Sequence, residues 1–427
     1  MTENLSYGII FIEKIVPPQV KRLASYIPFI GFREVSGTKI KEQTMHGNVS
    51  LHIIQKIVFA SLALFLIMLT DDLAYAVQPI RIGAIFSKSG IAATHNEPLI
   101  VMTQLAVDEL NQKGGIIGRK VELIIYDNQS TAIGSVIAAQ KAIKDDVTAV
   151  IGAHWSSHSL AMAPLLQEAG IPMISPGSTN PAVTLVGNYI FRACFLDSFQ
   201  GQAMAKFAYE SLGARTAVVM QNINETYSIT LTEFFSKAFT GNGGRILANN
   251  DYRGKAVDFT EILKSAKALQ PDVIYVPGYT IDSGLLIKQA VAMGIRSTFL
   301  GGDAWDEIDK VAGNALEGSY QSAPWHPGVP FKKSVHLKEV YRRHLNKDIE
   351  NYSAPLAYDA VMLLADAIRR CACMDKSKIR DQLAATSNFE GATGLINFDR
   401  NGDPQHKEII ILKYENGAFQ YLKSIQP

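Results

Sequence analysis

The chain has 427 residues, and its 41 Lys and Arg are nearly balanced by 40 Asp and Glu, for a formal net charge of +1. No strongly basic run or domain occurs, which argues against a nucleic-acid-binding protein. Hydrophobic residues make up 47% and charged residues 19%, as in an ordinary globular protein, and the length allows two domains with large cores.

The N-terminal region carries a targeting signal. The apolar run 57–69 has the length of a signal-peptide core and is short for a transmembrane helix. Ala74 and Ala76 place small residues at the two positions that a signal peptidase inspects. We therefore predict cleavage after Ala76 and a periplasmic location, with an uncleaved membrane anchor as the alternative. Met45 would begin an ordinary signal peptide, so we expect translation to start there and leave residues 1–76 out of the fold.

Strand and helix patterns alternate from residue 79 onward. Short apolar runs of strand length are each followed by a polar loop, and amphipathic helical patterns stand between them. This alternation is typical of an α/β domain with a parallel sheet. The expected strands are 79–86, 121–126, 149–152 and 171–174, and the expected helices are 98–111, 135–144 and 160–168.

The same alternation restarts at residue 216 and predicts a second α/β lobe. Residues 322–335 are rich in proline and glycine and suit a crossing between lobes. Near the end, 408–414 and 419–425 read as two strands joined by a hairpin turn. The other expected strands are 216–220, one following 243–247, 273–276 and 298–300, and the other expected helices are 230–239, 259–269, 283–294, 335–345, 355–371 and 377–384.

Two loops rich in hydroxyl groups follow neighbouring strands of the first lobe. Ser156 and Ser157 come after the strand 149–152, and Ser178 and Thr179 come after the next strand. Loops at the carboxyl ends of parallel strands meet at one edge of the sheet, where ligands bind. Free N–H groups at a helix start favour an anion, so a small carboxylate or amide is a reasonable guest. The alternative is that these side chains only cap helices.

Signatures of catalysis are missing from the sequence. It contains no dinucleotide-binding or P-loop glycine motif and no metalloprotease or serine-hydrolase motif. His154 and His158 flank the two serines, but a Ser–His pair so close in sequence carries little information, because the fold assembles catalytic pairs. The histidines show no metal-ligand spacing. We therefore expect no enzyme activity, no cofactor and no metal.

The sequence has 3 cysteines, Cys194, Cys371 and Cys373. This number is too small for a disulfide scaffold. Cys371 and Cys373 lie at the end of a helical pattern with no histidine pair beside them, which makes a zinc site a poor interpretation. We expect these two to be unpaired or weakly strained rather than redox-active, and an odd count leaves at least one thiol free.

Together, these segments resemble the periplasmic solute-binding proteins of ABC transporters, in the branch typified by the leucine/isoleucine/valine-binding proteins. The resemblance covers residues 79–425. It is carried by LAVDELNQKGGIIG at 105–118, HWSSHS at 154–159, ISPGSTNP at 174–181, RACFLDSFQG at 192–201, Gly278-Tyr279 and 391–403.

The resemblance implies a type I periplasmic binding fold, in which two doubly wound parallel-sheet α/β lobes are joined by a hinge and close on a solute. We expect residues 1–76 to be an N-terminal extension and signal peptide. Lobe 1 would then comprise 77–198 with 326–402, and lobe 2 would comprise 199–325 with 403–427.

The resemblance also implies site residues. Either of the two serines after 149–152 matches the serine that holds the ligand carboxylate, and the second hydroxyl loop matches positions that contact carboxylate and ammonium. Tyr227 and Tyr279 resemble aromatic residues of lobe 2. Asp303 stands where amino-acid binders place an acid for the ammonium group, a contact that strengthens when water is excluded. The candidate ligand-binding residues are Ser156, Ser157, Ser178, Thr179, Tyr227, Tyr279 and Asp303.

Some residues depart from the family pattern. IAATHNEP replaces the family's glycine-rich loop after the first strand, and we expect its polar residues 95–97 to be solvated, with a position in the cleft as the alternative. Tyr227 is followed by serine rather than glycine, and Tyr279 lacks a second aromatic neighbour. Trp155 and Trp305 flank candidate ligand residues and could line a larger, flatter pocket. We therefore expect a side-chain pocket that differs from that of the family.

We expect the substrate-binding component of an ABC importer, a monomer that delivers a small polar solute, an amino acid of branched-chain or related type, to a membrane permease. The first alternative is an amide, urea or aromatic-carboxylate binder, or a sensor, of the same fold. A receptor ectodomain would need a hydrophobic span after residue 77, and a transcription factor would need a DNA-binding helix pair before residue 79. The sequence shows neither.

Overall fold

The computed structural model describes residues 78–426, so the predicted signal peptide and the start at Met45 lie outside the described residues. None of the helices among residues 78–426 is long and apolar enough to cross a membrane.

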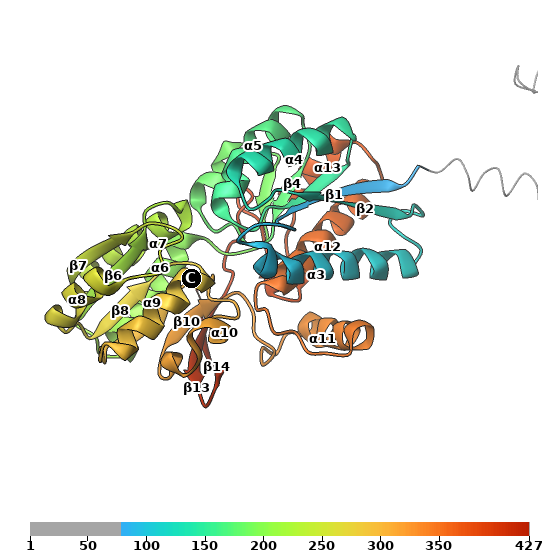
Figure 1. The fold of residues 1–427 in the computed structure, drawn as a ribbon. Coiled ribbons are helices and arrows are strands. Elements are labelled where there is room, and N and C mark those ends of the chain that lie inside the picture. Colours follow the sequence, from blue (N-terminus) through green and yellow to red (C-terminus); the bar gives the residue numbers. More distant parts are fainter. Residues whose placement is uncertain (1–77, 427) are drawn as a thin grey trace, which may run out of the picture. The chain divides into compact units, whose positions relative to one another are not determined.

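Five parallel strands form the first sheet, in the order β2-β1-β3-β4-β5. Its strands are β1 (Ile80–Phe86), β2 (Val121–Asp127), β3 (Ala149–Gly152), β4 (Met173–Ser175) and β5 (Ile190–Arg192). Helices α4 (Ala132–Lys144) and α5 (Ser156–Glu168) cover one face, and α3 (Ala93–Gln112) and α12 (Ala354–Cys371) cover the other (Figure 1). Because both faces are covered, the strands read as nearly continuous apolar runs.

Seven strands form the second sheet, in the order β14-β13-β10-β9-β8-β6-β7. Along β6, Ala217 and Val219 pack toward α6 and α7, whereas Val218 and Met220 pack toward α8 and α9. The predicted C-terminal hairpin is confirmed, since β13 and β14 pair antiparallel. The elements are β6 (Thr216–Asn222), β7 (Arg245–Tyr252), β8 (Val273–Val276), β9 (Thr298–Gly301), β10 (Tyr320–Ala323), β13 (Ile409–Glu415), β14 (Ala418–Ile425), α6 (Asp197–Lys206), α7 (Thr226–Gly241), α8 (Thr260–Leu269), α9 (Thr280–Ala292) and α10 (Asp309–Ala312).

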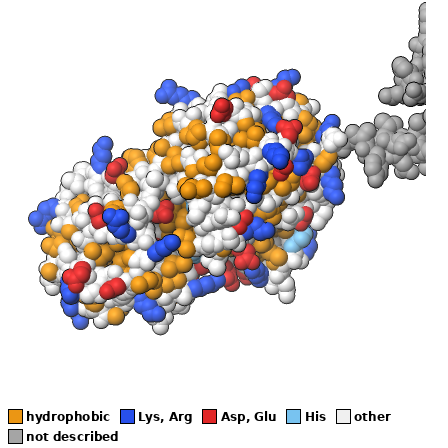
Figure 2. All heavy atoms as spheres, turned by 45° about the horizontal axis from the view of Figure 1, so that its top comes forward, with side chains coloured by type: hydrophobic (Ala, Val, Ile, Leu, Met, Phe, Trp, Pro, Cys, Tyr) orange, Lys and Arg blue, Asp and Glu red, His pale blue; other side chains and the backbone are white. Residues whose placement is uncertain are grey.

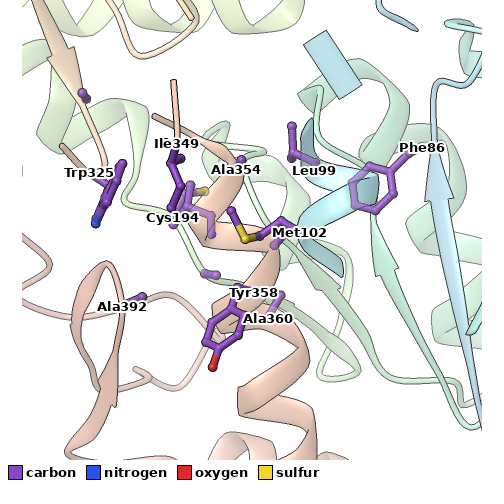
Figure 3. Close-up of a cluster of buried hydrophobic side chains, with 14 of the residues drawn as sticks. Phe86, Leu99, Met102, Cys194, Trp325, Ile349, Ala354, Tyr358, Ala360 and Ala392 are labelled. Carbon is purple, nitrogen blue, oxygen red and sulfur yellow. The ribbon is translucent and has the colours of Figure 1, made fainter. Parts of the chain in front are cut away.

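The chain passes three times between the two sheets: after β5, after β10 and before β13. Between the last two passages, α11 (Lys332–Leu345), α12, α13 (Lys376–Ala384) and the small hairpin of β11 (Phe389–Gly391) and β12 (Gly394–Ile396) return to the first sheet, where α12 packs on α3. Cys194 and Trp325, from two of the crossing segments, lie in the same apolar cluster as Ile349 and Ala354 (Figure 3). Two α/β lobes joined by a hinge are therefore confirmed, while their residue boundaries stay a prediction.

Several helices begin earlier than predicted. Helix α3 begins at Ala93 rather than at Pro98, because Asn96 holds the first turn: its side chain accepts from the Ser87 amide at 3.2 Å and donates to the Ala92 carbonyl at 3.0 Å. The expected solvated loop is therefore helical there, and Asn96 is buried. Likewise, α5 begins at Ser156 rather than at 160.

Helix α6 was not predicted, because its sequence DSFQGQAMAK is polar and lacks a clear apolar stripe. It forms by packing against α7. Gly201 allows this close approach, since a Cβ there would lie 2.6 Å from the Cβ of Phe234. Tertiary contact, rather than periodicity, decides this helix.

The expectation for Cys371 and Cys373 was wrong. The structure joins them in a disulfide, with Cα atoms 5.1 Å apart. Between them, Ala372 ends α12 in the left-handed region, with φ of 50°, so the chain turns back and the two side chains meet. Among the described residues, the free thiol is that of the buried Cys194.

Candidate ligand-binding site

Loops at the carboxyl ends of strands from both sheets meet around a small cavity of about 20 Å³. Four predicted site residues line this cavity: Ser156 from the first lobe, and Tyr227, Tyr279 and Asp303 from the second. A space of this size holds about one water molecule. The lobes are thus closed on one another here, and a solute can enter only when the lobes or their aromatic side chains move apart.

Ser156 is the first residue of α5 and is buried. Its hydroxyl accepts from the amide of Asn180 at 3.3 Å and makes no capping bond to its own helix, whose N-cap is Trp155. Capping therefore does not explain this serine. The N–H groups of Ser156 and Ser157 make no backbone hydrogen bond within residues 78–426, unlike those of the next two residues, and they favour an anion beside Ser156.

Ser178 and Thr179 lie just behind the cavity and do not line it. The Ser178 hydroxyl lies 3.1 Å from the carbonyl oxygen of His154 and 2.8 Å from the hydroxyl of Ser159, so it ties the two hydroxyl loops together. Thr179 is fully buried, and its hydroxyl makes no hydrogen bond of regular geometry among the described residues, although it lies near the Asp197 carboxyl group and offsets part of the rise that burial causes in that group's pKa. A buried hydroxyl without a partner is costly, which makes Thr179 the better candidate of the two for contact with a ligand.

Asp303 follows β9 and is 9% exposed. Its Oδ1 accepts a hydrogen bond from the Tyr227 hydroxyl at 2.9 Å. Burial raises the pKa of Asp303 to about 6, because a carboxylate loses its hydration there. An ammonium group in the cavity would restore the missing charge partner.

Asp197 and Gln200 were not predicted as site residues. Both are fully buried near the start of α6, and their polar side-chain atoms make no hydrogen bond of regular geometry among the described residues. Thr179 nevertheless lies close enough to Asp197, and Gln200 close enough to Asp303, to offset part of the rise that burial causes in the pKa of each carboxyl group. Burial raises the pKa of Asp197 to about 8, and the nearby Asp303 carboxylate contributes to the rise. Both residues lie in RACFLDSFQG at 192–201, one of the segments that carry the family resemblance, so the sequence could have indicated them as site residues.

Four rings stack across the boundary between the lobes. Trp155 stacks on Tyr279 with ring centroids 3.9 Å apart and planes 15° apart. The outer face of Trp155 meets His158 at 5.3 Å, and the outer face of Tyr279 meets Tyr227 at 5.5 Å. Aromatic stacking of this kind contributes about 0.5–1.5 kcal/mol per pair beyond the buried area. The ring stack therefore stabilises the closed arrangement.

Hydrogen bonds also join the lobes, and two of them lie close to the cavity. The Ser157 hydroxyl donates to Glu225 Oε2 at 3.3 Å, and the Asn180 side-chain amide donates to Thr230 Oγ1 at 2.8 Å. Ser157 therefore contacts the other lobe rather than the cavity. Burial raises the pKa of Glu225 to about 7. The sequence did not single out Glu225, although it lies only two residues before Tyr227.

The other candidates have different roles. Trp305 is fully buried and donates its indole N–H to the Val276 carbonyl at 3.1 Å, so it belongs to the core and does not line the pocket as predicted. Burial lowers the pKa of His154 to about 3 and that of His158 to about 4, which keeps both rings neutral. Among residues 78–426, no three His, Cys, Asp or Glu side chains are grouped to hold a metal ion.

Comparison with known proteins places the chain among solute-binding proteins. Residues 79–418 match the family described as periplasmic binding protein. A leucine-, isoleucine-, valine-, threonine- and alanine-binding protein of Pseudomonas aeruginosa is 27% identical over 346 residues, which cover 80% of this chain and 92% of that protein.

Two solved structures are similar throughout. A leucine-binding protein of Thermotoga maritima is 35% identical, with a TM-score of 0.77 over 82% of this chain and 99% of that one. A branched-chain amino acid transporter substrate-binding protein of Streptococcus pneumoniae, in complex with isoleucine, is 30% identical, with a TM-score of 0.78 over 82% and 100%.

Proposed function

The chain belongs to the periplasmic binding protein family, and from this premise we propose that it captures an amino acid between its lobes and delivers it to the membrane permease of an ABC importer. The resemblance to proteins named for leucine, isoleucine and valine supports an amino acid as the solute. The lobe boundaries 77–198 with 326–402 and 199–325 with 403–427, cleavage after Ala76 and a monomeric state belong to the same proposal.

The observation that carries the proposal is the pairing of opposite chemistry across one cavity. The first lobe presents the Ser156 hydroxyl and the N-terminal end of α5, which suit a carboxylate. The second lobe presents the buried carboxylate of Asp303, which suits an ammonium group. An α-amino acid carries both charges one carbon apart, so it can bridge the two lobes.

The mixed surface charge supports a solute that carries no net charge. Lys and Arg are interspersed with Asp and Glu over the face shown in Figure 2. No large field of one sign would steer a polyanion to this face. A zwitterionic solute needs no such steering.

A thermal-shift screen tests the proposal. The purified protein is partly unfolded and refolded to remove carried-over solute, and then heated with single amino acids, urea, short amides and aromatic carboxylates. A ligand at a hundredfold its dissociation constant adds about 2.7 kcal/mol to the free energy of unfolding, a shift of several degrees. We expect shifts with amino acids. Shifts only with amides, urea or aromatic acids would favour the alternative solutes instead.

The pH dependence of affinity gives a second prediction. An ammonium group pairs with Asp303 only when that carboxyl group is ionised, and its pKa is about 6. Amino-acid affinity should therefore rise as the pH increases from about 5 to 7, by up to about tenfold per pH unit below the pKa, and then level off. Titration calorimetry measures this, and Asp303→Asn should flatten the rise. Affinity that falls over this range would contradict the role of Asp303.

A substitution at Gly302 tests the geometry around Asp303. A Cβ on Gly302 would lie 2.1 Å from the Tyr227 hydroxyl, so Gly302→Ala should push that hydroxyl away from Asp303. We expect amino-acid binding to weaken by about 1–2 kcal/mol in calorimetry. Gly241→Ala is the matched control, because Gly241 ends the helix that carries Tyr227 and its added methyl meets nothing within 4 Å. Equal losses in both variants would remove the steric explanation.

A further inference from the structure

A second and larger cavity, of about 420 Å³, lies beside the same aromatic pair. Trp155 and Tyr279 line both this cavity and the small one. The two cavities are therefore adjacent, and a solute with its charged head near Asp303 can extend into the second cavity once these two rings move apart. The names of the related proteins do not identify which part of a solute this cavity binds.

The walls of this larger cavity are mostly apolar, and three of their apolar side chains are exposed and come from separate segments. Ile91 is 51% exposed, Val257 is 72% exposed and Ile281 is 47% exposed. Ile91 belongs to the first lobe, and the other two belong to the second. Large apolar side chains left at a surface and converging on one hollow mark a binding site.

Two carboxylates that line this cavity have fixed partners, whereas the buried Nδ1 of His95, which also lines it, has none among the described residues. Asp282 accepts from the Tyr252 hydroxyl at 2.6 Å and from the Asn222 amide at 3.1 Å, so its carboxylate is already bonded. Glu225 accepts from Ser157 at 3.3 Å. These contacts leave the apolar walls to decide which side chain the cavity takes.

The ring stack indicates what shape of guest fits. Trp155 stacks with both Tyr279 and His158, and Tyr279 stacks with both Trp155 and Tyr227, so ring faces are occupied by other rings of the stack. Ring edges therefore remain to line the cavities. Ring edges carry partial positive charge and attract the negative face of another aromatic ring.

We propose that the 420 Å³ cavity binds the side chain of the solute, and that the preferred solute is an amino acid with an aromatic side chain. This inference rests on the proposed function. A cavity of this volume is far larger than an isopropyl or isobutyl group, which would leave apolar wall exposed to water. An aromatic side chain covers more of that wall and meets the edges of Trp155 and Tyr279.

The test compares amino acids that share the same ammonium and carboxylate groups and differ in the size of the side chain. Titration calorimetry on the refolded, solute-free protein compares alanine, valine, leucine, phenylalanine and tryptophan. We expect phenylalanine or tryptophan to bind at least about tenfold more tightly than valine, because more apolar area is buried.

Two variants on one helix show whether the cavity causes the preference. Ile281 and Val291 both lie on α9, with 47% and 42% exposure, and only Ile281 lines the cavity. Ile281→Asp should weaken binding of phenylalanine or tryptophan about tenfold and leave alanine binding unchanged. Val291→Asp should change neither. Val257→Asp provides a second cavity variant at an exposed position.

Each other outcome is decisive. Tightest binding of valine or leucine, with no effect of Ile281→Asp, would overturn the aromatic preference and leave the proposed function standing. If 3-phenylpropanoate, which lacks the ammonium group, binds as tightly as phenylalanine, the cavity still binds an aromatic side chain. The proposed recognition of an amino acid through its ammonium group would then be overturned. If none of the five amino acids gives measurable binding, both the aromatic preference and the proposed function would be overturned.

Discussion

Arg192→Met is expected to lower the free energy of unfolding by about 3–5 kcal/mol, the cost of breaking a buried ion pair from one side. The Arg192 side chain is fully buried, and its Nε donates to Asp403 Oδ1 at 2.6 Å. Its other nitrogens donate to the Ser178 and Asn180 carbonyls, the latter at 3.0 Å, and to Thr184 Oγ1 at 2.9 Å.

These contacts explain why the loss should be large. Arg192 ends β5 and fixes the carbonyls on both sides of Thr179, so the second hydroxyl loop depends on it. Asp403 lies in the last passage between the sheets, so the same side chain joins that loop to the hinge. Methionine would leave the buried Asp403 carboxylate without its charged partner and the Ser178 carbonyl without a donor, although Thr184 Oγ1 would still donate to Asp403 and the Val183 N–H to the Asn180 carbonyl.

Urea unfolding followed by circular dichroism measures the loss. Arg342→Met is the matched control, because Arg342 pairs with Asp348 at the surface, where the two side chains are 64% and 69% exposed. That substitution should cost less than about 1 kcal/mol. The double variant Arg192→Met with Asp403→Leu should recover part of the loss, since it leaves no unpaired charge. An Arg192→Met variant as stable as the surface control would contradict this account.

Asp303→Asn is expected to weaken binding of an amino acid by about 1.5–3 kcal/mol, or roughly ten- to 150-fold, because it removes a hydrogen bond between charged groups. Thr179→Ala should cost a similar amount if its buried hydroxyl bonds the ligand. Stability of the empty protein should not fall in Asp303→Asn, because the ionised carboxyl group is unfavourable in this buried position, as its raised pKa shows.

Calorimetric titration of the two variants against the unaltered protein checks this prediction. Asp251→Asn, at an exposed position on β7 in the same lobe, is the control for charge removed at a distance. Unchanged affinity in both Asp303→Asn and Thr179→Ala would remove these residues from the site.

Much of the fold could be predicted from sequence because apolar strands and amphipathic helices leave a periodic signal. The alternation gave both sheets, and the C-terminal hairpin followed from its Glu-Asn-Gly turn. The start of α3 was misplaced because Pro98 looks like a helix start, whereas the side chain of Asn96 extends the helix upstream. Helix α6 has no apolar stripe of its own and depends on packing with α7.

The site was less readable from sequence. Ser156, Tyr227, Tyr279 and Asp303 follow strands and meet because parallel strands present their carboxyl ends together. The cross-lobe contacts could not be predicted, because they depend on how far the lobes close. The stack of Trp155 on Tyr279 and the bond from Ser157 to Glu225 both join residues far apart in the chain.

The most direct test of the central claim separates the two charges of the ligand. Calorimetry would compare phenylalanine with 3-phenylpropanoate, which lacks the ammonium group, and phenethylamine, which lacks the carboxylate, and would repeat the comparison with leucine and 4-methylpentanoate. The account predicts that each truncated compound binds at least about tenfold more weakly than its parent, since each loses a hydrogen bond to a charged group. A compound without the ammonium group that binds as tightly as its parent amino acid would contradict it.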